Sequence, residues 1–117
     1  MRILHFPLKN KWYNLIKQGI KTEEYREINH YWAKRILKDY PIEWRFRMAI
    51  CIEAEDFSMF EGKEFGGWDK AHFTLGYPKA DDADRNMFKD IDKIVIAQGN
   101  PDWGAEQGKY YFVIRLK

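Results

Sequence analysis

Apolar residues follow two different spacings along the first forty positions, and these spacings predict alternating strands and helices. A short apolar run at positions 3–8 predicts a strand, and Pro7 within it suits a sheet edge or a strand end. Positions 10–18 carry apolar residues three and four apart, which predicts a helix, and Gly19 supplies the left-handed end that helices favour. Alternation over positions 21–28 then predicts a second strand.

A second helix is predicted to begin after Asn29, which is a suitable N-cap, and to end before Pro41. Trp32, Ile36 and Leu37 would form its buried stripe. The predicted order of the first forty residues is therefore strand, helix, strand, helix.

Positions 42–57 fit two different structures. Alternation of Trp44, Phe46 and Met48 with arginines favours a strand, whereas other apolar residues of the segment have helical spacing. We predict a helix, because no turn signal interrupts the segment and it is longer than a typical strand.

The remaining apolar runs predict three more strands separated by turns. They cover positions 71–75, which end at a turn at 76–78, positions 91–96, and positions 110–116. A chain of 117 residues buries one modest core, so we predict a single α+β domain over residues 1–117.

Three ionisable side chains gather where the first helix is expected to give way to the second strand: Lys21, Glu24 and Arg26. In an extended segment Glu24 and Arg26 point to the same face, about 6 to 7 Å apart. We therefore expect both to face one cavity, with Lys21 at its rim. The alternative is an exposed ion-pair cluster at a strand edge, which would contribute little stability and no chemistry.

The pattern G-x-K-x-x-E-x-R at positions 19–26, after a helix that carries Trp12, resembles the ASCH domain family, a branch of the PUA-like fold associated with RNA and modified nucleosides. The first strand, the helix start at 29–32, the turn at 76–77 and the segment from 100 to 116 keep the order and rough spacing of small phage and bacterial members. This resemblance implies a PUA-like small mixed β-barrel with flanking helices, in which residues 38–67 form a variable insertion.

The resemblance also implies a cleft at this motif that binds RNA or a nucleotide-like or nucleoside ligand. In family members that hydrolyse acetylcytidine, a Lys and a Thr here act with a distant Glu on an amide-like bond. Lys21 matches that Lys, but Glu24 occupies the Thr position and no residue is matched to the distant Glu. We therefore expect a binding module, with Arg26 among its ligand contacts.

Hydrolysis of a modified nucleoside or of RNA, without a metal, is the alternative function. Glu24 would then be the general base, and Lys21 or Arg26 would stabilise the negative charge that develops in the transition state. Lys21 and Glu24 are accordingly the candidate catalytic residues.

Positive charge is concentrated in the first part of the chain. Through Arg47 there are 11 lysines and arginines against 5 acidic residues, and afterwards 9 against 13, within a net charge of +2. This asymmetry suits a basic face that holds phosphates, or an ordinary solvated surface if folding interleaves the two parts. Lys9 and Lys11 flank the start of the first helix, where backbone donors can bind a phosphate. Tyr77 and Trp103, each expected on a turn, are candidates for stacking on a base.

The remaining polar and sulfur side chains do not form a metal-binding pattern. His5, His30 and His72 stand far apart in sequence and Cys51 has no partner at ligand spacing, so we expect neither a metal nor a cofactor. Cys51 lies among apolar neighbours and is expected to be buried. No signal-peptide pattern or membrane-spanning run is visible, and a cytoplasmic location, in a bacterial or phage-infected cell, is expected.

A third interpretation is a phage protein that binds a host protein through the insertion. Exposure of Trp44, Phe46 or Phe57 would favour it, because large apolar side chains gathered on a surface mark interaction sites.

Overall fold

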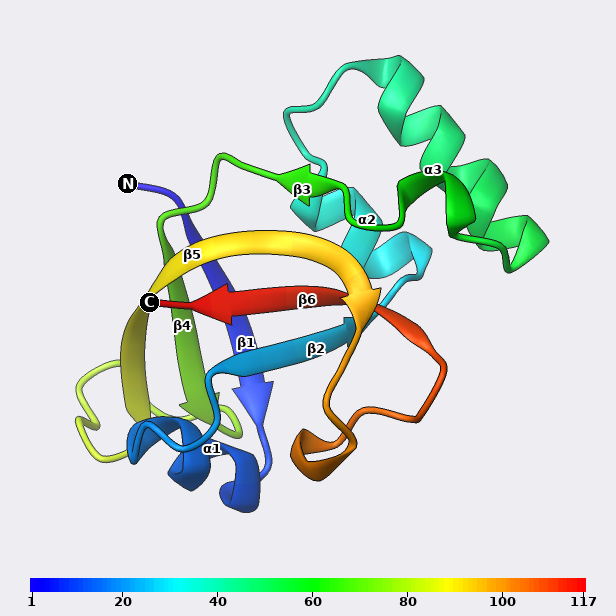
Figure 1. The fold of residues 1–117 in the computed structure, drawn as a ribbon. Helices are drawn as coiled ribbons and strands as arrows, with labels where there is room; N and C mark the ends of the chain where they lie inside the picture. Colours follow the sequence, from blue (N-terminus) through cyan, green and yellow to red (C-terminus); the bar gives the residue numbers. More distant parts are fainter. The chain divides into compact units, whose positions relative to one another are not determined.

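The computed structural model describes residues 1–117, which form three α-helices and six β-strands (Figure 1). The strands are β1 (Ile3–Leu8), β2 (Glu23–Glu27), β3 (Glu64–Phe65), β4 (Lys70–Leu75), β5 (Asn86–Gln98) and β6 (Tyr110–Leu116). The helices are α1 (Asn10–Lys17), α2 (His30–Ile36) and α3 (Ile42–Ala54), and two short 3₁₀ turns, η1 (Ser58–Phe60) and η2 (Pro101–Trp103), complete the list.

The strands form one mixed sheet in the order β1-β4-β5-β6-β2, and β3 pairs with β5. The β1 and β4 strands are parallel, whereas β4 and β3 each run antiparallel to β5. The three helices and the six-stranded mixed sheet confirm the predicted α+β class and are compatible with a small barrel-like fold. No helix combines the length and the apolar character that crossing a membrane requires.

The chain divides into two compact units, which we describe separately. The first unit contains Met1–Glu24, Gly66–Lys93 and Ile114–Lys117, and the second unit contains Tyr25–Phe65 and Ile94–Val113.

In the first unit, α1 packs against β4 on the parallel pair of β1 and β4. Tyr13 and Ile16 of α1 are buried, as are Phe6 of β1 and Phe73 of β4, whose rings lie 5.7 Å apart. The predicted helix is confirmed: α1 ends at Lys17, and Gly19 follows it with a positive φ of 77°. Pro7 lies in β1, which is an edge strand of the sheet. Proline has no backbone N–H to donate to a neighbouring strand and is tolerated in such a position.

In the second unit, α2 begins at the predicted N-cap, because the Asn29 side chain accepts a hydrogen bond of 2.9 Å from the Trp32 backbone N–H. The predicted helix after Pro41 is also confirmed, although α3 ends at Ala54, three residues before the expected end. Glu55 adopts a left-handed conformation with φ 52° and so ends the helix. The alternation of Trp44, Phe46 and Met48 with arginines does not mark a strand. Within α3, Met48 is buried, whereas Phe46 is exposed on another face of the helix.

Aromatic contacts form much of the core of the second unit. Phe65 of β3 lies 6.3 Å from Phe60, 6.2 Å from Phe112 of β6 and 5.5 Å from Tyr40, measured between ring centroids. The residues between α2 and β3 therefore contribute to this core and are not simply a surface loop.

Candidate functional site

Lys21 and Glu24 form a buried ion pair in the short segment between α1 and β2. The Lys21 ammonium lies 3.1 Å from Glu24 Oε1, and the two residues are 1% and 4% exposed. The Lys21 backbone N–H donates to Leu15 O at the end of α1, which turns the chain inward before β2 begins. The expectation that Lys21 lies at a rim is therefore wrong, and the alternative of an exposed ion-pair cluster does not apply to this pair.

The indole of Trp12 lies against two ammonium groups. Lys21 Nζ is 4.4 Å and Lys11 Nζ is 4.7 Å from the ring centroid, and Trp12 is partly exposed. Ammonium groups at this distance are attracted by the negative face of the ring. Trp12 thus connects the buried ion pair to Lys11 at the start of α1.

The N-terminus of α1 has features that suit an anion. Lys9 and Lys11 are both exposed, the side chain of the N-cap residue Lys9 does not cap the helix, and the first turn contains no acidic residue. The first N–H groups of a helix have no partner within the helix and carry partial positive charge. Two exposed ammonium groups therefore flank backbone donors that no side chain caps.

Tyr77 follows a turn that contacts the end of β1, and its ring centroid lies 6.4 Å from that of His5. The Gly76 backbone N–H donates to Leu8 O at 3.4 Å, and Gly76 turns the chain with a φ of 68°. Tyr77 is 85% exposed, so most of its ring is accessible. Lys9, Lys11 and Tyr77, three of the predicted ligand contacts, thus belong to one unit and two of them adjoin the end of β1.

Arg26 and Trp103 belong to the second unit and have contacts there. The Arg26 guanidinium donates to Tyr25 O at 2.8 Å and lies 5.2 Å from the Trp32 ring centroid. Trp103 is partly buried against an apolar cluster that includes Tyr25 and Tyr111. A common cavity for Glu24 and Arg26 remains a prediction, as does a stacking role for Trp103.

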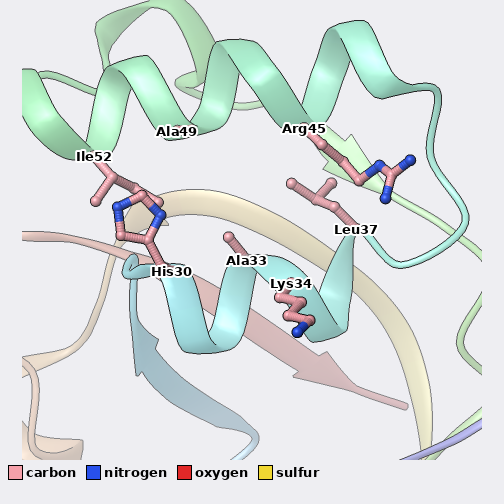
Figure 2. A pocket seen from close by; sticks show the side chains of 7 residues that line it. All are labelled: His30, Ala33, Lys34, Leu37, Arg45, Ala49 and Ile52. Carbon is pink, nitrogen blue, oxygen red and sulfur yellow. The ribbon is translucent and has the colours of Figure 1, made fainter.

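A pocket that the sequence did not indicate lies between α2 and α3 (Figure 2). Its volume is about 260 Å³, and the small side chains of Ala33 and Ala49 leave this space between the two helices. Lys34 and Arg45 line it together with Leu37 and Ile52. At His30, which also lines it, a contact of 2.7 Å from Nε2 to Glu53 Oε1 connects the helices. The pocket is thus apolar within and basic at its edge.

Cys51 is buried in α3, as predicted. Burial raises the pKa of its thiol, and the nearby Asp56 carboxylate raises it further. The thiol is therefore kept protonated and unreactive, since the thiolate is the nucleophile.

Comparison of the sequence with models of protein families and with curated proteins, and of the structure with solved structures, finds no match.

Proposed function

We propose that the protein is an RNA- or nucleotide-binding module whose phosphate site is the N-terminus of α1. The observation that supports this most strongly is the uncapped first turn, which is flanked by the exposed Lys9 and Lys11 and contains no acidic residue. Backbone N–H groups and ammonium groups together suit a phosphate. The exposed ring of Tyr77, which adjoins the end of β1, suits the base of the same nucleotide.

The buried Lys21 and Glu24 pair has a supporting role in this proposal. Its ammonium packs on the Trp12 ring, and Trp12 in turn contacts Lys11, so the pair helps to hold the helix start in place. Both candidate catalytic residues are at most 4% exposed and pair with each other, which favours binding over turnover. The resemblance of positions 19–26 to the ASCH family points to the same class of ligand.

Salt-dependent binding of RNA tests this proposal. A labelled single-stranded RNA octamer should bind with an affinity that falls as salt rises, and replacing Lys9 and Lys11 together by Ala should lower the magnitude of the log–log salt slope by about 1.4. Lys17→Ala, which removes an exposed lysine at the other end of α1, is the matched control. Equal effects of the two variants, or no binding at low salt, would contradict the proposed site.

Hydrolysis has a separate test. Because Glu24 replaces the expected Thr and is paired with Lys21, we expect no useful release of cytidine from N4-acetylcytidine. Chromatography of the nucleoside after incubation measures this directly. Cytidine formation that disappears in Lys21→Ala would make the hydrolase the better account.

Binding of a protein partner is the second candidate function, and the surface of α3 favours it. Ile42, Phe46 and Ile50 recur every four residues, so they share one face of the helix, and all three are exposed, Phe46 by 67%. A row of large exposed apolar side chains is typical of an interaction surface. Replacing Phe46 by Ser should abolish such binding and leave RNA binding intact.

A further inference from the structure

Three strands of the first unit present aromatic rings in one row across the sheet. His5 of β1 is the register partner of His72 of β4, and His72 is the partner of Phe88 of β5. Ring centroids lie 5.1 Å apart for His5 and His72, and 4.3 Å apart for His72 and Phe88, whose planes differ by only 7°. Tyr77 extends the row, with its ring edge-on to His5 at 6.4 Å. We call these four side chains the aromatic row.

The opposite side of this part of the sheet is the one that packs in the core. Along β4 the side chains alternate, so that Ala71 and Phe73 are buried while His72 is partly exposed. Phe88 is 52% exposed although one face of its ring stacks on His72. Its exposed area therefore lies on the other ring face and the edge, where a further planar group can continue the stack.

Both imidazole rings are held by hydrogen bonds to Thr74 and Asn86, which form the neighbouring row on the same face of the sheet. The Thr74 hydroxyl donates to Gly76 O, so it accepts from His5 Nε2 at 2.8 Å. The Asn86 amide nitrogen donates to Lys79 O and Asp82 O, so Asn86 Oδ1 accepts from His72 Nε2 at 2.8 Å. Fixed rings lose little conformational entropy when a ligand binds, which makes the row a preorganised surface.

The aromatic row belongs to a unit with an excess of positive charge, which suits an anionic ligand. The next row of the sheet contains Lys70 and Asp90, which form an ion pair of 3.1 Å and so offset each other. Lys9 follows the end of β1, the strand that contains His5. The first unit as a whole has 12 lysines and arginines against 8 aspartates and glutamates. A polyanion with planar groups is complementary to both features.

We propose that the aromatic row binds unpaired bases of single-stranded nucleic acid, one stacked on the outer face of Phe88 and another on Tyr77. Every base has a planar π face, so such stacking tolerates different sequences, and a duplex hides the faces that it needs. Two inter-strand spacings, about 10 Å, separate β1 from β5, so the ligand is a segment of several nucleotides. The inference shares only Tyr77 with the function proposed above, and the Phe88 site is separate from the phosphate site.

A comparison of ligands and variants tests the inference. Affinities would be measured for a single-stranded RNA octamer, for the duplex of the same sequence and for a mononucleotide, with wild type, Phe88→Leu and Ile3→Ala. Phe88→Leu keeps an apolar side chain but removes the ring, and Ile3→Ala alters an exposed apolar residue of the neighbouring row. Thermal unfolding of each variant would confirm that it is folded.

Phe88→Leu should weaken octamer binding roughly 5- to 150-fold, as expected for the loss of one base stack. Mononucleotide binding, which uses Lys9, Lys11 and Tyr77, should not change, and the duplex should bind more weakly than the octamer. An octamer affinity equal to that of wild type in Phe88→Leu, an equal loss in Ile3→Ala, or equal binding of the duplex would overturn the inference.

Different results would contradict the phosphate site and the aromatic row. If replacing Lys9 and Lys11 leaves octamer binding unchanged while Phe88→Leu reduces it, the phosphate site is wrong and the aromatic row stands. If Phe88→Leu has no effect while the lysine variant reduces octamer binding, the aromatic row only stabilises the sheet.

Discussion

Among single residues, Lys21 and Glu24 carry the largest electrostatic cost. Removing two charges from water costs several kcal/mol for each ion, and their attraction at 3.1 Å offsets that cost only while both are present. A sequence alternation alone did not reveal this burial, because it shows which residues share a face but not whether that face is covered. The pair is therefore an element of structure first, and its contact with Trp12 links it to the proposed phosphate site.

Breaking this pair should be strongly destabilising. Lys21→Met leaves the buried Glu24 carboxylate without this ammonium, and we expect a loss of about 3 to 5 kcal/mol in the free energy of unfolding. The exposed pair of Lys109 and Glu27, at 3.5 Å, is the control, and Lys109→Met should cost less than about 1 kcal/mol. Urea unfolding measures both, and equal effects would show that the Lys21 pair is not sequestered from water.

Cys51 provides a prediction about pH. Its pKa is raised in the folded state, so the native protein holds the thiol proton more tightly than the unfolded chain does. This contribution to stability is complete below the ordinary pKa of about 9.0 and is lost as the pH rises through the folded-state value. The stability of wild type relative to Cys51→Ala should therefore decrease as the pH rises past about 9.0 in urea unfolding. A constant difference would contradict the assignment.

Among the elements, those with local signals were predicted well. The Asn29 cap, the end of α1 before Gly19 and the helical character of α3 all depend on residues that are close in sequence. Two strands were harder to predict from the sequence. The β5 strand is 13 residues long, from Asn86 to Gln98, where a strand over positions 91–96 was predicted, and β3, which was not predicted, has only two residues. The pairing of β5 with β4 holds the polar start of β5 in the sheet, and such long-range pairing cannot be read from local alternation.

The turn after β5 gives a prediction at the same scale. A Cβ at Gly99 would lie 2.6 Å from Ala105 Cβ and 2.7 Å from Tyr25 Cε1, so Gly99→Ala should destabilise the protein by about 1 to 3 kcal/mol through overpacking. Gly66 has no atom within 4 Å of such a Cβ, so Gly66→Ala is the matched control. Thermal unfolding compares the two variants, and similar stabilities would show that the turn can rearrange at little cost.

At the scale of the whole molecule, the sequence predicted some of the candidate site but not its arrangement. The sequence predicted Lys9, Lys11 and Tyr77 as ligand contacts because of the chemistry of their side chains. That they belong to one unit depends on the parallel pairing of β1 with β4. The partnership of His72 with Phe88 follows from register between strands and has no local sequence signal. The pocket between α2 and α3 likewise depends on how two helices pack.

Mapping the bound RNA by NMR tests the central claim most directly. With the ¹⁵N-labelled protein at low salt, a single-stranded RNA octamer should shift the backbone amide signals of Asn10, Lys11 and Trp12 most, because these N–H groups open α1 and would meet the phosphate. The ring protons of Tyr77 should shift with them. Changes confined to the exposed face of α3 around Phe46, or no changes at all, would contradict the proposed nucleic-acid site.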